Sequence, residues 1–134
     1  MNKIKVHIST ITESIEDEKD FTVVLQNTEY VIGIRVRKQQ AVLLYGAISK
    51  RADLMLPHTL INKILEPLNY RVTEIVIDNL FEGTYNSLVY YSNGKNIYSV
   101  DSAVNDALII SAINSAPIYI VDTLLHQYGT KIKN

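Results

Sequence analysis

The stretch that decides the fold is residues 71–113, RVTEIVIDNLFEGTYNSLVYYSNGKNIYSVDSAVNDALIISAI. Three runs within it, 71–80, 84–91 and 96–100, are rich in β-branched and aromatic residues, as strands are. The second and third runs are separated by Asn93-Gly94, a dipeptide typical of a tight hairpin because both residues accept positive φ. Residues 103–113 are apolar nearly all round. The pattern predicts an antiparallel meander followed by a buried helix.

The first half of the chain repeats this order. Strand-like runs over 3–11, 21–26 and 29–36 precede apolar residues at helical spacing over 38–49. A shift of 66 positions pairs Asn27 with Asn93 and Gln40-Ala41 with Asp106-Ala107. An ancient duplication of a βββα unit would explain the match, and chance is the alternative because identities are few.

A further helix is expected between the halves. Pro57 suits the first turn of a helix, apolar residues recur at three- and four-residue intervals over 60–68, and Pro67 should end or kink it. Near the end of the chain, residues 118–121 form a strand-like run, and Asp122 is placed to cap a last helix. We therefore expect an α+β fold with a mixed or antiparallel sheet. It would consist of two βββα-like units with an inserted helix, the helices packed on the sheets.

Composition narrows the class of protein. The 134 residues are 47% hydrophobic and 20% charged, which is typical of one globular domain over residues 1–134. No apolar run is long enough for a membrane span, and the start has no signal-peptide core, so we expect a cytoplasmic location and no membrane partner. The absence of cysteine excludes thiolate metal sites and cysteine nucleophiles. The net charge of −1 argues against a broad basic surface for duplex DNA.

Several segments resemble one known family. Asp78-Asn-Leu-Phe-Glu-Gly-Thr-Tyr85 and Val100-Asp-Ser-Ala-Val-Asn-Asp-Ala-Leu108 resemble the motifs of the bifunctional nuclease domain family. Pro57-His58-Thr59-Leu60-Ile61 stands where the family has Thr-His-Asp-Leu-Leu, and Ala116-Pro117-Ile118-Tyr119 resembles its Ala-Pro-Ile-Tyr segment. The matches follow the family's order over most of the chain. The resemblance implies an α+β fold, with RNase and DNase activity attributed to some members.

The chain also departs from the family pattern. Ala103-Val104-Asn105 replaces Arg-Pro-Ser, and Thr59 replaces the acid after the histidine. Arg37 replaces a glycine and Gln40 a glutamate. His58, Asp78, Gly83, Asp101, Asp106 and Ala107 are kept. The resemblance therefore implies membership without implying that catalysis is retained.

The kept carboxylates suggest a cation site. In an antiparallel meander the first and third strands run the same way, so Asp78 and Asp101 should lie at one end of the sheet, with Glu82 in the turn beside them. Asp106, early in the next helix, would face that end. Oxygen ligands of this kind suit Mg²⁺ or Mn²⁺, which assist phosphodiester cleavage, and no organic cofactor is indicated. The predicted metal ligands are Asp78, Glu82, Asp101 and Asp106, and the predicted catalytic residues are His58, Asp101 and Asp106.

Each of these residues also has a purely structural interpretation. Asp101 or Ser102 is suited to cap the following helix, the helix dipole favours Asp106, and Asp78 and Glu82 can be solvated turn residues. His58 near a helix N-terminus would favour the neutral imidazole, which can serve as base or ligand, or it is simply a surface histidine. The hairpin tyrosines, Tyr85, Tyr90, Tyr91 and Tyr98, either stack on unpaired bases or pack across strands.

Two functions follow. The first is metal-assisted hydrolysis of single-stranded RNA or DNA by a divergent member of the family. The second is a catalytically inactive, homo-oligomeric interaction domain that keeps the fold after losing the site. A homo-oligomer suits both, because a small sheet must cover its edges.

Overall fold

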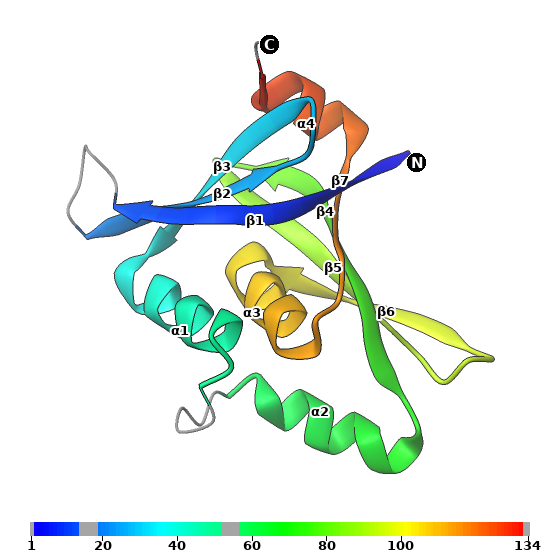
Figure 1. The fold of residues 1–134 in the computed structure, drawn as a ribbon. Helices are drawn as coiled ribbons and strands as arrows, with labels where there is room; N and C mark the ends of the chain where they lie inside the picture. The colour runs from blue at the N-terminus through cyan, green and yellow to red at the C-terminus, as the bar shows by residue number, and fades with distance from the viewer. Residues whose placement is uncertain (1, 14–18, 52–56, 133–134) are drawn as a thin grey trace.

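The computed structural model describes residues 2–13, 19–51 and 57–132, which form an eight-stranded mixed sheet with helices packed against it (Figure 1). The strand order is β6-β5-β4-β7-β1-β2-β3-β8, and neighbours are antiparallel except for the parallel pair β4 and β7. The strands are β1 (Lys3–Glu13), β2 (Asp20–Gln26), β3 (Tyr30–Arg37), β4 (Arg71–Phe81), β5 (Thr84–Ser92), β6 (Ile97–Ala103), β7 (Ile118–Val121) and β8 (Thr130–Lys131). The helices are α1 (Lys38–Ile48), α2 (Thr59–Leu65), α3 (Val104–Asn114) and α4 (Asp122–Tyr128), with a 3₁₀ turn, η1 (Glu66–Leu68), after α2. The predicted α+β class is confirmed.

The order βββα occurs twice, as β1-β2-β3-α1 and as β4-β5-β6-α3. We call these the first half and the second half. β7 lies between β1 and β4 in the sheet, so the halves flank it on either side. α1 begins at Lys38 and α3 at Val104, which are 66 positions apart. The helix α2 lies between the halves in sequence, where the insertion was expected.

The hairpin turns of the two halves are built by the same contacts. Asn27 Oδ1 accepts hydrogen bonds from the backbone N–H groups two and three residues ahead, at 2.8 and 2.7 Å. Asn93 Oδ1 does the same at 2.9 and 2.7 Å. Asparagine is favoured in such turns because its side chain can satisfy the backbone locally. The pairing predicted by the 66-residue shift therefore joins two residues with the same structural role.

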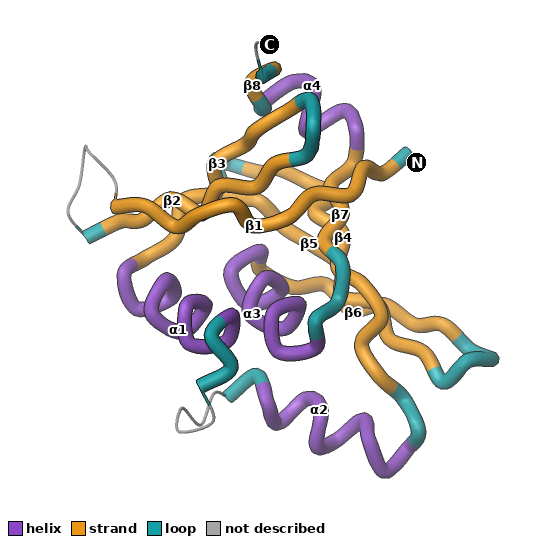
Figure 2. The backbone as a smooth tube through the Cα atoms, in the orientation of Figure 1, coloured by secondary structure: helices purple, strands orange, loops and turns teal. Residues whose placement is uncertain are grey.

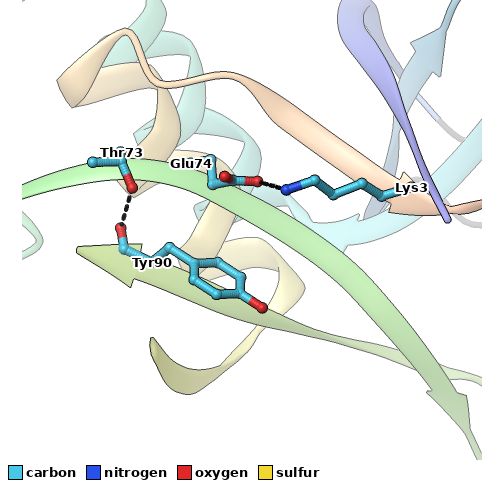
Figure 3. A network of polar contacts seen from close by, with 4 residues as sticks. All are labelled: Lys3, Thr73, Glu74 and Tyr90. Carbon is cyan, nitrogen blue, oxygen red and sulfur yellow. Dashed lines mark hydrogen bonds and ion pairs between the residues drawn. The ribbon is translucent and has the colours of Figure 1, made fainter. Parts of the chain in front are cut away.

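The first strand of each half carries a matching irregularity. The strand register shifts at Ser9 in β1 and at Thr73 in β4. Each hydroxyl donates to a carbonyl oxygen of the neighbouring strand at 3.4 Å, that of Tyr90 in the case of Thr73 (Figure 3). The same view shows Lys3 of β1 paired with Glu74 of β4, an ion pair between the first strands of the two halves. Ser9 and Thr73 are 64 positions apart, two fewer than the 66-residue shift, so the two irregularities are similar without falling at paired positions, and common ancestry of the halves stays a prediction.

The core lies between the sheet and two adjacent helices. α1 and α3 lie side by side against the sheet (Figure 2). In α3 the buried residues are Val104, Ala107, Leu108, Ile109, Ile110 and Ser111, which confirms the expected buried helix. Among the residues that the structure describes, no helix is both long and apolar enough to cross a membrane.

Two predicted helix caps are wrong. β6 continues to Ala103, so Asp101 and Ser102 lie in a strand, paired with β5, instead of capping α3. Both residues have register partners in β5, Leu88 and Ser87, and Ala103 is the N-cap residue. Asp122 is likewise the first residue of α4 and not its cap, which is Val121. Pairing with β5 extends β6 beyond the end at residue 100 that local sequence suggests, whereas β7 ends at Val121 as predicted.

Candidate functional site

Two side chains from distant parts of the chain meet where α3 begins. His58 is the N-cap residue of α2, and Asp106 lies in the first turn of α3. Nε2 of His58 lies 2.8 Å from Oδ1 of Asp106. The histidine side chain is only 12% exposed and the aspartate side chain 49%, so the pair opens to solvent on the aspartate side. We call these two residues the His–Asp pair.

The contact fixes the roles of the two ring nitrogens. An ionised carboxylate can only accept, so in the neutral imidazole Nε2 carries the proton and donates it to Asp106. The lone pair is then on Nδ1, which is buried and has no hydrogen-bond partner among the residues that the structure describes. A buried polar atom without a partner costs about 1–3 kcal/mol, which a purely structural histidine would avoid. A histidine oriented by a carboxylate through one nitrogen, with the other free, is the arrangement of a general base.

A pocket of about 560 Å³ adjoins the His–Asp pair. It lies between α2, α3 and the strands β4, β5 and β6, and its walls are mostly apolar. The lining residues are Pro57, His58, Ile61, Leu65, Val72, Val89, Tyr91, Val100, Asp101, Ser102, Asp106 and Ile110. Pockets of this size with a few convergent polar groups are typical ligand sites. We call this space the apolar pocket.

A second, polar hollow of about 440 Å³ lies beside it. Its lining residues are Asp78, Asn79, Asn86, Asp101, Ser102 and Ala103. Burial raises the pKa of Asp78 above its usual value; a backbone hydrogen bond opposes this rise and the negative charge of Asp101 adds to it. The two carboxylates are close enough to repel each other, and the amide side chains of Asn79 and Asn86 lie beside them, so the hollow is rich in oxygen atoms. We call it the acidic hollow.

The strand β6 separates the two spaces. Val100 pairs with Val89 of β5, and both line the apolar pocket. Because side chains alternate along a strand, the side chain of Asp101 lies on the opposite face from that of Val100, toward the acidic hollow with Asp78, and Asp101 borders both spaces. The meander prediction thus placed Asp78 and Asp101 together, as the structure does.

The predicted set of four carboxylates is divided. Asp106 faces His58, Asp78 and Asp101 share the acidic hollow, and Glu82 lies exposed in the β4–β5 turn with a positive φ of 50°. Within the described residues, no three histidine, aspartate or glutamate side chains form a group suited to hold a metal ion. The reason is the alternation along β6 and the helical step to Asp106, which a linear motif does not display.

Three tyrosines extend the wall of the apolar pocket. Tyr91 of β5 is stacked on Tyr98 of β6, with ring centroids 5.7 Å apart and planes at 28°. Tyr70 lies 5.9 Å from each of them. Tyr91 and Tyr98 are direct cross-strand partners, and Tyr98 is half exposed. Of the four hairpin tyrosines, Tyr91 lines the pocket and Tyr98 is stacked on Tyr91, whereas Tyr85 contacts Tyr128 of α4 and Tyr90 lies near Lys3.

Sequence reasoning did not foresee the His–Asp contact itself or the apolar pocket. His58 and Asp106 were each selected as candidates, but their partnership crosses 48 positions and depends on where α2 lies. The apolar stripe of α2 was the available signal, because Ile61 and Leu65 line the pocket while Leu60 and Ile64 of the same helix are exposed. A helix that is apolar on two sides faces more than one surface.

Comparison with known proteins identifies the family. The family model described as bifunctional nuclease domain matches residues 23–133, nearly the whole chain. The chain belongs to the bifunctional nuclease domain family. No curated protein matches it closely enough to add a relative. The predicted membership is confirmed, and membership in a nuclease-domain family suggests nucleic-acid binding.

Proposed function

We propose that this bifunctional nuclease domain protein cleaves phosphodiester bonds in single-stranded RNA or DNA, with its catalytic centre at the His–Asp pair. The observation that carries the proposal is the 2.8 Å contact between His58 Nε2 and Asp106 Oδ1, with Nδ1 left unpartnered beside a ligand-sized pocket. Both residues lie on segments that match the family motifs, and the match to the family model includes them.

The proposed chemistry is general-base catalysis. The lone pair on Nδ1 of His58 takes the proton of the attacking water, and the carboxylate of Asp106 stabilises the imidazolium that forms. Nδ1 is buried in the observed conformation, so the ring has to shift to meet that water. The element that carries the ring suits this movement, because none of the residues of α2 is buried.

A divalent cation is a further part of the proposal. Asp78 and Asp101 offer carboxylate oxygens and Asn79 and Asn86 offer amide oxygens, which are ligands that Mg²⁺ and Mn²⁺ accept. Mg²⁺ commonly uses only one or two carboxylates and completes its shell with water and substrate phosphate, so the donors of the acidic hollow fit it. When bound there, the cation would shield the charge of the phosphate.

The test is cleavage of labelled single-stranded RNA and DNA with Mg²⁺, Mn²⁺ or EDTA. We expect His58→Gln and Asp106→Asn each to lower the rate about 10²–10⁴-fold. The double variant should fall little further, because the two residues act as a unit. His7→Gln, which changes an exposed histidine of β1, is the control and should leave the rate unchanged.

Two results would contradict the catalytic proposal. Cleavage that persists in Asp101→Ala/Asp106→Ala would identify a contaminant. No cleavage by the wild-type protein under any of these conditions would favour a catalytically inactive member of the family.

A second candidate function is self-association, and the outer side of α2 favours it. Leu60 and Ile64 of α2 and Leu68 of η1 recur at four-residue steps, and each is more than half exposed. Exposed apolar stripes of this kind are typical of protein interfaces. Ile64→Lys should then shift the molar mass measured by light scattering toward the monomer, whereas Phe81→Lys, an equally exposed apolar position at the end of β4, should not. A wild-type protein that is already monomeric would exclude this function.

A further inference from the structure

We infer that the apolar pocket, together with the exposed ring of Tyr98, binds an unpaired nucleobase of the substrate beside the His–Asp pair. The inference rests on the proposed nuclease function and adds a binding site to it. It concerns the face of β6 that points toward α2 and α3; this face adjoins the acidic hollow, with which the pocket shares Asp101 and Ser102.

The first evidence is that the molecule closes the equivalent face in its other half. Val100 corresponds to Ile34 of β3 and Tyr98 to Ile32, as the pairing with the neighbouring strand shows. Ile34 and Ile32 are 1% and 3% exposed, whereas Val100 and Tyr98 are 54% and 49% exposed. The fold is therefore able to bury this face completely and leaves it open only where the His–Asp pair lies.

The second evidence is the chemistry of the open face. The floor of the pocket consists of buried aliphatic side chains such as Val72 and Ile110. Tyr91 lines the pocket, and the half-exposed ring of Tyr98 is stacked on it. A nucleobase is planar and has a π face, and stacking on aromatic side chains is how proteins hold single strands with little sequence preference. Duplex DNA does not offer its base faces, so the site requires an unpaired base.

The third evidence is position. His58 and Asp106 line the same pocket as Tyr91 and Val100. A base held there is joined through its sugar to the phosphate, so binding of the base brings the bond to be cleaved toward the His–Asp pair. Holding the reacting groups together in this way is itself a source of rate enhancement.

A second copy of the chain is the competing occupant. The concave shape of the pocket and its position beside the buried histidine favour a small planar group over the broad contact of another subunit. The exposed stripe of α2, on the other side of that helix, is the surface that suits a subunit.

The experiment measures binding of two strands by fluorescence anisotropy in EDTA, with gel analysis to show that the strands stay intact. One strand is a fluorescein-labelled nonamer of deoxythymidine, and the other is a nonamer in which every base is replaced by a tetrahydrofuran spacer. We expect Tyr98→Ala to weaken binding of the thymidine strand about 5- to 100-fold and to leave binding of the spacer strand unchanged. Tyr98→Phe should bind both strands as the wild type does, and Tyr45→Ala, which changes an exposed tyrosine of α1, is the matched control.

Three outcomes would overturn the inference. The first is equal binding of the two strands by the wild-type protein, which needs no variant and so holds even if Tyr98→Ala fails to fold. The second is an equal effect of Tyr98→Ala on both strands. The third is a change of oligomeric state in Tyr98→Ala with binding unaltered, which would assign the face to a second copy. Base-dependent binding without any cleavage by the wild type would instead contradict the proposed nuclease function and keep the base site.

Discussion

The two halves of the molecule share a backbone plan and differ in how their outer strands are covered. β3 contacts both α1 and α4, and its inward residues Ile32, Ile34 and Val36 are all buried. β6 contacts α3, while the inserted helix α2 makes its main sheet contact with β4. In the first half α4 packs the fully buried Leu125 into the core, whereas none of the residues of α2 is buried.

The helices that follow the outer strands differ in chemistry in the same way. Gln40 in the first turn of α1 accepts a hydrogen bond from the backbone N–H of Arg37 at 2.9 Å, so it serves its own helix. Asp106 holds the corresponding place in α3 and contacts His58 of another segment. The position of Arg35 in β3 corresponds to that of Asp101 in β6. This comparison shows that the candidate site lies in the second half, where α2 contributes His58 and where the side chains of β6 remain exposed.

The largest expected effect is on the free energy of unfolding, and it tests whether α4 contributes to the stability of the core while α2 does not. Leu125→Ala should lower the free energy of unfolding by about 2–5 kcal/mol, because Leu125 is fully buried. Ile61→Ala on α2 should cost less than about 1 kcal/mol, because Ile61 is partly exposed beside the pocket. Urea denaturation measures both. Equal costs would show that α2 closes its half as α4 does, and the contrast between the halves would be lost.

The next largest effect is expected when Asp106 of the second half is replaced by glutamine, the residue at the corresponding position, 40, of the first half. Asp106→Gln should free His58, because the longer amide can bond to its own helix start as Gln40 does. We expect cleavage to fall at least about 10²-fold, equivalent to about 2.7 kcal/mol. The free energy of unfolding should fall by about 1–2 kcal/mol, because Nε2 of the mostly buried His58 loses its partner. Gln40→Glu is the matched control and should keep full activity. Loss of activity in the control would place the site elsewhere.

Much of the fold follows from local sequence because the deciding signals are local. Asn93-Gly94, the β-branched runs and the apolar helix over 103–113 each report on a few neighbouring residues, and the structure has the elements they predict. Element ends were less certain, since β6 continues through Asp101 and Ser102 by pairing with β5. No feature within β6 itself distinguishes a paired strand end from a helix cap.

The site was harder to predict because it depends on long-range placement. His58, Asp101 and Asp106 were identified as candidates from motif positions, which is a statement about each residue separately. Their distribution between two spaces follows from the alternation along β6 and from the location of α2. The sequence offers no local pattern for either, so it predicted one carboxylate group where the structure has a His–Asp pair and an acidic hollow.

A smaller effect tests whether the two turns are equivalent. Asn27→Ala and Asn93→Ala each remove an acceptor of two backbone hydrogen bonds. We expect each to lower the free energy of unfolding by about 1 kcal/mol, and by the same amount within about 0.5 kcal/mol. Aspartate at either position keeps the acceptor and should restore stability. A clearly larger loss of unfolding free energy in one half would mean that the two turns share their geometry but contribute unequally to stability.

The smallest effect concerns the charge at the acidic hollow. At this place the second half has Asp101, whereas the first half has Arg35 at the corresponding position. Burial and, to a smaller extent, the charge of Asp101 raise the pKa of Asp78 above its usual value of 3.8, although a backbone hydrogen bond opposes them. The folded protein therefore disfavours the ionised form, and this penalty is absent below pH 3.8 and fully present once the pH exceeds the raised pKa.

Asp78→Asn should accordingly stabilise the metal-free protein near pH 7, by less than about 0.5 kcal/mol because Asp78 is only partly buried. The gain should shrink as the pH falls toward 4. In Asp101→Arg, which gives the second half the charge of the first, the gain at pH 7 should be smaller because repulsion is replaced by attraction. Urea midpoints in EDTA at the two pH values measure both effects, and a gain that does not depend on the residue at 101 would show that the two carboxylates are independent.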